Sequence, residues 1–275
     1  MLSYQHGYHA GNHADVLKHL VLHRVLSHLN LKSRGWTFLD THAGAGQYNL
    51  GSDQALKTGD ARTGILRIRQ AEGKPAPVNA WLDHIKKDDD RYPGSPLLAA
   101  SLARPVDRLV FCERHPAEYR ELESSCRSSS ASIRTIEGDG FAAVKYTLPP
   151  PSRRGAVLID PSYEREEDWT AVIESIAAGL RRFASGTFMV WYPRLRARDN
   201  ARFIRALEAL ESTEWLHAVL DVSKPEEKTF FGSGLFVVNP PWTLAAELAL
   251  SLPWLADALG QDQQGTFALR HPSAG

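Results

Sequence analysis

The stretch Trp36-Thr37-Phe38-Leu39-Asp40-Thr41-His42-Ala43-Gly44-Ala45-Gly46 predicts both the fold class and the place of a ligand site. Its first five residues are typical of a buried strand that ends in an acid, and its two glycines predict a tight turn whose backbone passes close to a ligand. A complete dinucleotide fingerprint needs a third glycine, but Asn49 stands at that position. The shortened turn favours a ligand without a pyrophosphate, such as S-adenosylmethionine.

A second stretch, Leu158-Ile159-Asp160-Pro161-Ser162-Tyr163, ends an apolar run with a carboxylate, a rigid backbone carbonyl and an aromatic ring. These groups are suited to holding a planar amino group. A rival of similar pattern, Asn239-Pro240-Pro241-Trp242, occurs near the end of the chain. We favour Asp160, because ligands of open α/β sheets bind at strand carboxyl ends near the switch point. We expect the rival to be a strand-ending turn in which Trp242 packs.

Strands and helices alternate along the chain, which predicts an α/β protein with a mostly parallel sheet covered on both faces and an antiparallel last strand. After the first strand, we expect strands at 108–112, 132–136, 156–159, 187–191, 216–222 and 235–238, and helices that include 97–103, 169–182 and 199–210.

The expected domain organisation is one main domain with an insertion. Glu113 is the best candidate for a ribose-binding acid, yet it lies 67 residues after Gly46, where such folds usually need about 20. The excess predicts a small helical subdomain at 51–91 over the ligand edge of the sheet. The main domain is then 1–50 and 92–260, with 1–30 as a segment that contacts cofactor and substrate, and 261–275 is expected to be a loosely held tail.

The N-terminal segment is rich in histidine, with six of the eleven in the first 28 residues. Asn12 can cap a helix that follows it, and two histidine pairs spaced four apart could each place two ligands on one helix face. No carboxylate or cysteine completes an evident ligand set. We therefore expect no metal site, and a polar, partly cationic rim around a ligand site instead.

The bulk composition excludes a disordered chain and a membrane-spanning one. Lys and Arg total 32 against 32 for Asp and Glu, so a polyanionic partner must be met by a local basic patch. Two cysteines outside any Cys-x-x-Cys pattern and a start without an apolar leader predict a reduced cytoplasmic enzyme. We expect it to be a monomer. Candidates for phosphate contact are Lys18, Arg153, Arg154, Arg194, Arg196 and Arg198.

Several motifs together resemble the RlmJ family of class I S-adenosylmethionine-dependent methyltransferases, which have a Rossmann-like fold and methylate N6 of an adenine in bacterial 23S rRNA. The run Gly11-Asn12-His13-Ala14-Asp15-Val16-Leu17-Lys18-His19 is the most family-specific. The others are Leu2-Ser3-Tyr4, Leu39 to Gly46, Tyr92-Pro93-Gly94-Ser95-Pro96, Ser152-Arg153-Arg154-Gly155 and Trp191-Tyr192-Pro193.

The resemblance implies a role for each matching position. Asp160, Pro161 and Tyr163 would be catalytic, with N6–H held by the Asp160 carboxylate and the Pro161 carbonyl. Tyr4 would contact 23S rRNA that is protein-free or in an early assembly state. From their chemistry we also expect Tyr163 to stack on the target base and Lys18 to contact the RNA. S-adenosylmethionine would be bound by His19, His42, Gly44, Ser95, Glu113 on the ribose, Asp139 and Gly140 on the adenine, and Asp160.

One departure from the family pattern is Ser162, which stands where the family has a second proline. Serine restores a backbone N–H and frees φ, so the presentation of Tyr163 to the base is less fixed. Two alternatives stay open. One is methylation of DNA adenine or a protein glutamine, and the other is a non-catalytic RNA-binding module on the same fold.

Overall fold

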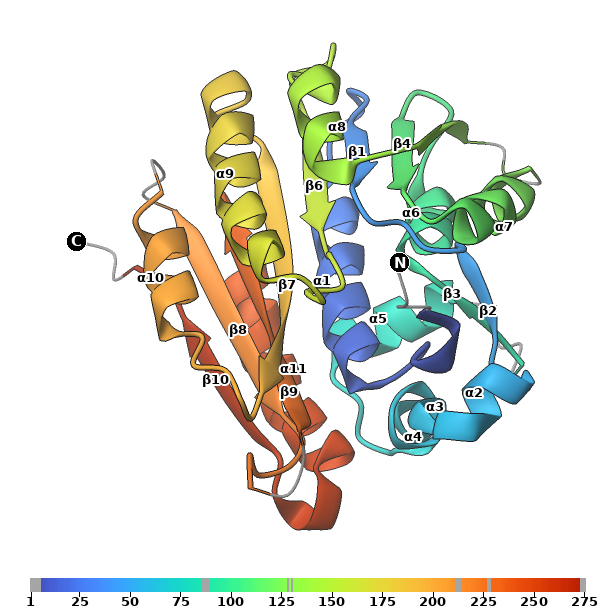
Figure 1. The fold of residues 1–275 in the computed structure, drawn as a ribbon, viewed down its shortest axis with the longest axis vertical. Helices are drawn as coiled ribbons and strands as arrows, with labels where there is room; N and C mark the ends of the chain where they lie inside the picture. The colour runs from blue at the N-terminus through green and yellow to red at the C-terminus, as the bar shows by residue number, and fades with distance from the viewer. Residues whose placement is uncertain are drawn as a thin grey trace.

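The structure, a computed structural model, describes residues 6–85, 90–127, 129, 131–210, 214–226 and 229–272. Over these residues an eight-stranded sheet crosses the molecule in the order β10-β8-β9-β7-β6-β1-β4-β5 (Figure 1). The strands are β1 (Thr37–Asp40), β4 (Arg108–Glu113), β5 (Ser132–Glu137), β6 (Gly155–Ile159), β7 (Thr187–Leu195), β8 (Trp215–Asp221), β9 (Phe230–Val238) and β10 (Thr266–Arg270).

The sheet is mostly parallel, as predicted. Strands β5, β4, β1, β6 and β7 pair in parallel, whereas β9 lies between β7 and β8 and is antiparallel to both. The strand order reverses at β1, which has β4 on one side and β6 on the other. The carboxyl ends of β1 and β6 therefore form the switch point at which such sheets bind ligands.

Helices cover both faces of the sheet. Along β6, Val157 and Ile159 pack into one apolar cluster with α9, while Ala156 and Leu158 pack into the other with α1, as the period of two in a strand requires. One face carries α8 (Gly140–Thr147), α9 (Glu166–Arg182) and α10 (Ala201–Glu208); the other carries α1 (His13–Leu29), α6 (Ser95–Leu102), α7 (Pro116–Cys126) and α11 (Leu244–Leu259).

The insertion is helical, as expected, and it shares the main core. Its apolar side chains, among them Ile65 and Trp81, belong to the same buried cluster as Leu20 and Phe38. The helices contact α1 and α11, and the short strands β2 (Gln47–Asn49) and β3 (Arg91–Pro93) pair where the chain leaves and re-enters. That the insertion is a separate domain stays a prediction. Its helices are α2 (Asp53–Thr58), α3 (Asp60–Thr63), α4 (Ile65–Gln70) and α5 (Ala76–His84).

The expectation of a loosely held tail is wrong for Thr266–Arg270. These five residues form β10, which pairs antiparallel with β8 from Thr266 opposite Asp221 to Arg270 opposite His217. The Gln- and Gly-rich composition before them hid a short strand rich in β-forming residues. The preceding helix α11 was not predicted either. No helix in the described part of the chain has the length and apolarity to cross a membrane.

The rival tetrapeptide lies at the amino ends of the parallel strands, whereas Asp160 lies at their carboxyl ends. Because β9 is antiparallel to β7, its end meets the start of β7, where the Thr187 hydroxyl donates to the Asn239 carbonyl (2.8 Å). The Asn239 amide also donates to Ala184 O and Gly186 O. The predicted turn is confirmed, but the expected packing of Trp242 is wrong, since that side chain is 83 % exposed.

Candidate active site

A cavity of about 400 Å³ lies where the carboxyl ends of β1, β4 and β6 meet the start of α1. Apart from the arginine candidates for phosphate contact, every site residue that the sequence predicts within the described part of the chain lines this cavity. Tyr4 falls outside the described residues. The predicted residues that line it are Lys18, His19, His42, Gly44, Ser95, Glu113, Asp139, Gly140, Asp160, Pro161 and Tyr163.

Helix α1 brings three polar side chains to one wall of the cavity. Asn12 caps the helix as predicted, and its side chain accepts from the N–H groups of Ala14 (2.9 Å) and Asp15 (3.0 Å). From that start, Asp15, Lys18 and His19 occupy positions i, i+3 and i+4, which share a helix face. The cap therefore fixes which side chains reach the site.

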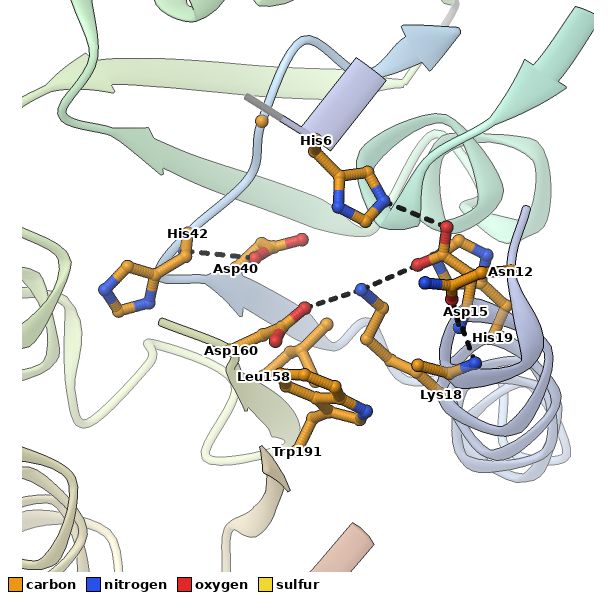
Figure 2. A network of polar contacts seen from close by, with 12 residues as sticks. His6, Asn12, Asp15, Lys18, His19, Asp40, His42, Leu158, Asp160 and Trp191 are labelled. Atoms are coloured by element: carbon orange, nitrogen blue, oxygen red, sulfur yellow. Dashed lines mark hydrogen bonds and ion pairs between the residues drawn. The ribbon is translucent and has the colours of Figure 1, made fainter. Parts of the chain in front are cut away.

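A buried ion-pair network joins α1 to the end of β6 (Figure 2). Lys18 Nζ lies 2.9 Å from Asp15 Oδ1 and 2.5 Å from Asp160 Oδ2. On its other oxygen Asp15 accepts from His6 Nε2 (2.9 Å) and from the Gly11 N–H (2.8 Å). The Lys18 side chain is 7 % exposed, so its ammonium takes part in a bridge inside the site. This burial contradicts the expectation that Lys18 contacts RNA phosphates.

The network fixes the charges of its members. Burial alone would lower the pKa of Lys18, but Asp15 and Asp160 together hold that pKa above its ordinary value. Burial would likewise raise the pKa of Asp15, but His6 and Lys18 hold it well below the usual range. At neutral pH Lys18 is therefore a cation and Asp15 an anion.

Two predicted cofactor contacts, His19 and His42, are neutral at pH 7. Burial lowers the pKa of His19 to about 3 and that of His42 to about 4. His19 Nδ1 hydrogen-bonds the Tyr92 hydroxyl at 2.6 Å, and His42 Nδ1 lies 2.8 Å from the Thr41 hydroxyl. Each ring therefore offers hydrogen bonds to a ligand without adding charge.

Asp40, which ends β1, lies next to the site residue His42 but does not itself line the cavity, and sequence reasoning assigned it no role. It is fully buried, and Oδ1 accepts from the His42 N–H at 3.2 Å. Burial raises the pKa of Asp40 to about 7, and the nearby Asp160 adds to the rise. Its position at the end of the first strand was the available signal. Asp15 was also missed, although its spacing to Lys18 and His19 was visible.

Glu113, the last residue of β4, holds the glycine turn that follows β1. Its carboxylate accepts from the Gly44 N–H (2.8 Å) and from the His115 N–H (2.7 Å). Gly44 has φ of +61°, a conformation that glycine adopts without strain. These two bonds fix the Glu113 carboxylate at the cavity wall. Each oxygen keeps a further lone pair, so Glu113 can still accept hydrogen bonds from a ligand.

Asp139 caps α8, accepting from the Phe141 N–H at 2.9 Å through Oδ1, which leaves Oδ2 as an acceptor. Gly140 lines the cavity, and packing by itself already requires a glycine at this position. A Cβ at this position would lie 1.8 Å from the Thr41 carbonyl, so glycine is required by the packing of α8 against the turn after β1.

Tyr163 lines the cavity from a tightly packed position. Its hydroxyl donates to the Trp191 carbonyl (2.6 Å), its ring lies 4.2 Å from that of Trp169, and the residue is 8 % exposed. Its φ is +54°, which is uncommon for an aromatic residue. The turn that contains Ser162 is therefore anchored by Tyr163 itself.

The predicted basic residues divide between the amino and the carboxyl ends of the parallel strands. Arg194 pairs with Asp221 (2.6 Å), and Arg198 pairs with Glu166 (2.6 Å) while lying 3.9 Å from the Trp169 ring centroid. Arg154 precedes β6, at the amino ends of the parallel strands, and donates to the Leu29 carbonyl. Arg153 and Arg154 are thus remote from the cavity. In the described part of the chain, no group of three or more metal-ligating side chains gathers at one point.

Comparison with known proteins gives consistent matches over the whole chain. Residues 33–271 match the family described as "Ribosomal RNA large subunit methyltransferase D, RlmJ". The chain is 40 % identical to "Ribosomal RNA large subunit methyltransferase J" of Haemophilus influenzae, covering 98 % of both, and 43 % identical to the protein of that name from Escherichia coli, covering 94 % of both.

A solved structure has the same fold over almost the full length. It is the crystal structure of protein LPL1258 from Legionella pneumophila, with a TM-score of 0.89 and 30 % sequence identity, and the match covers 97 % of this chain and 99 % of that one.

Proposed function

This chain belongs to the RlmJ family of ribosomal RNA large subunit methyltransferases, and from that premise we propose that it transfers a methyl group from S-adenosylmethionine to N6 of one adenine in 23S rRNA. The observation that carries the proposal is the Asp160 carboxylate, held by Lys18 at the end of β6 and open to the cavity that Glu113 also lines.

Asp160 would act as a fixed acceptor for the adenine amino group. An exocyclic amine is a weak nucleophile because its lone pair is delocalised into the ring. Since Lys18 occupies Oδ2, Oδ1 is the oxygen that remains to accept a hydrogen bond from N6–H, with the Pro161 carbonyl as the second acceptor. Such bonds direct the nitrogen lone pair toward the methyl donor, which is catalysis by positioning and electrostatics.

The cavity fits the proposed cofactor in its charges and acceptors. S-adenosylmethionine supplies a methyl group on a cationic sulfur. Asp160, Glu113 and Asp139 place carboxylates around the space, and their charge favours a cationic ligand. The acceptor capacity left on Glu113 suits ribose hydroxyls, and that left on Asp139 suits an adenine amino group.

The target base would have to leave its stack to reach Asp160. Tyr163 and Trp191 line the cavity beside Asp160, and Tyr4 is proposed to complete the aromatic surface. Contact with an aromatic face stabilises an unstacked base by about 1 to 3 kcal/mol. We extend the proposal to a monomer that acts in the cytoplasm on protein-free or early-assembly rRNA.

The test is methyl transfer from labelled cofactor to protein-free 23S rRNA fragments, followed by mapping of the modified base. We expect label on N6 of a single adenine. The Asp160→Asn protein is the matched negative control. Label on a DNA oligonucleotide or a glutamine-containing peptide, with none on rRNA, would contradict the substrate class. RNA binding without any transfer by the wild-type protein would contradict enzyme activity.

A further inference from the structure

A second hollow, of about 250 Å³, opens on the sheet face that carries α8, at the starts of β4 and β5. Helix α8 has eight residues and is about 12 Å long, so it covers the carboxyl halves of these strands and leaves their amino halves open. Arg108 and Arg134 line the hollow from the sheet, and Tyr146 lines it from the last turn of α8.

The two arginines reach the hollow from the same face of the sheet. Arg108 stands opposite Ser132, and Val110 opposite Arg134, in the parallel register of β4 and β5. Side chains at alternate positions share a face, so both guanidinium groups project beside each other. Within the described part of the chain neither forms an ion pair or a hydrogen bond, and none of the residues lining the hollow is acidic.

Tyr146 adds an aromatic surface to this cationic floor. It is 57 % exposed, although tyrosine rings are usually more covered. Partial burial raises the pKa of its phenol, and the positive charge of Arg134 opposes that rise, which agrees with the two groups lying close together. A flat ring beside two free guanidinium groups matches a nucleotide, which has one planar base and one phosphate.

Helix α8 connects the hollow to the active site. Gly140 and Phe141 at its start line the active-site cavity, and Tyr146 and Thr147 at its end line the hollow. Along β4, Glu113 borders the cavity and Arg108 borders the hollow, so the two are separated by about 17 Å at about 3.3 Å per residue. A single strand a few nucleotides long can span that distance.

We propose that this hollow is a second RNA subsite, which holds a nucleotide of the substrate strand a few positions from the target adenine, with its phosphate on Arg108 and Arg134 and its base on Tyr146. The proposal rests on the proposed function. It gives a chain of zero net charge a local basic site for RNA on the face that leads away from the catalytic pocket.

The test compares wild-type protein with Arg108→Gln/Arg134→Gln and with Tyr146→Ala, on an rRNA fragment that extends well beyond the target adenine. We expect KM for this RNA to rise about tenfold in each variant, with kcat and cofactor affinity unchanged. The slope of log affinity against log salt should fall by about 0.7 for each lost phosphate contact in the double variant.

Two matched variants separate the subsite from general surface charge. Arg120→Gln removes an exposed arginine from α7 on the other face of the same strands, and Tyr146→Phe keeps the ring; both should retain wild-type KM. Wild-type transfer together with unchanged RNA affinity in the double variant would overturn the subsite and leave the proposed function intact. Direct RNA binding decides the matter even if transfer fails. Tight binding of adenosine monophosphate with unchanged RNA affinity would overturn the proposal in favour of a free nucleotide.

Discussion

Lys18 Nζ lies 2.5 Å from Asp160 Oδ2 although the two residues are 142 positions apart in the chain. One comes from the second turn of α1 and the other from the end of β6. The contact makes the N-terminal helix part of the environment of the proposed catalytic carboxylate, because the Lys18 ammonium occupies one of the Asp160 oxygens and leaves the other for a ligand.

Asp160→Asn should lose transfer by roughly 10²- to 10³-fold, the scale on which one electrostatic group contributes. Cofactor affinity should change little, because Glu113 and Asp139 remain. Single-turnover transfer and calorimetric titration of cofactor check the two statements. Full activity would remove Asp160 from the proposed role.

Lys18→Met should lower the free energy of unfolding by roughly 3 to 5 kcal/mol, because it leaves the buried carboxylate of Asp15 and the largely buried carboxylate of Asp160 without their shared cation. Without the cation the pKa of Asp15 rises, so the acid limb of the activity profile should move to higher pH. Lys18→Arg keeps the charge and should recover part of both properties. Urea unfolding at pH 7 and a pH–rate profile measure them, and an unchanged profile in the Met variant would argue against the coupling.

Ser162→Pro should be tolerated, with transfer within about twofold of wild type or faster. Among the described residues the Ser162 N–H donates no hydrogen bond, so its removal costs little, and the Tyr163–Trp191 bond continues to hold the turn. Steady-state transfer to rRNA is the measurement. Complete loss of activity would mean that the serine turn differs in backbone shape from a two-proline turn.

Gly140→Ala should destabilise the protein by about 1 to 3 kcal/mol and weaken cofactor binding, because the new Cβ forces α8 away from Thr41. Gly138→Ala is the matched control, since its Cβ would have no neighbour closer than 4.0 Å. Thermal unfolding and cofactor titration of both variants give the comparison. Equal behaviour of the two would contradict the packing argument.

His217→Gln should reduce the sensitivity of the fold to acid. Burial lowers the pKa of His217 to about 4, while in the unfolded chain it is near 6.5. Between these values the unfolded state binds a proton that the native state does not, so stability falls as the pH falls, by up to about 1.4 kcal/mol per unit. The variant should show a shallower loss from pH 6.5 to 4 in denaturant titrations, and exposed His271→Gln should match wild type.

Sequence reasoning was most reliable for residues that stand directly at the carboxyl end of a predicted parallel strand. Asp160, Glu113 and the Gly44 turn reach the same cavity because parallel strands deliver their carboxyl ends to one edge. It was least reliable where the meaning of a residue depends on distant partners. Lys18 looked like a surface cation, and its pairing with Asp160 exists because α1 packs beside β6.

The same limit applies to Tyr163 and Trp242. The pattern around each predicted an aromatic ring after a turn, but exposure is set by what else packs there. Tyr163 is enclosed by α9 and β7, whereas Trp242 follows the end of β9 and remains open to solvent. Gly140 is similar, because its requirement comes from a carbonyl on a segment 99 positions earlier.

Strand β10 covers the edge of the sheet beside β8. Without it, β8 would be the outermost strand and would present a row of unpaired N–H and C=O groups, a template on which a neighbouring chain can add a strand. With it, the outer edge is one short strand that ends in Arg270, whose guanidinium pairs with Glu208. Shortening the chain at residue 260 would therefore spare the proposed catalytic residues yet expose a surface prone to aggregation.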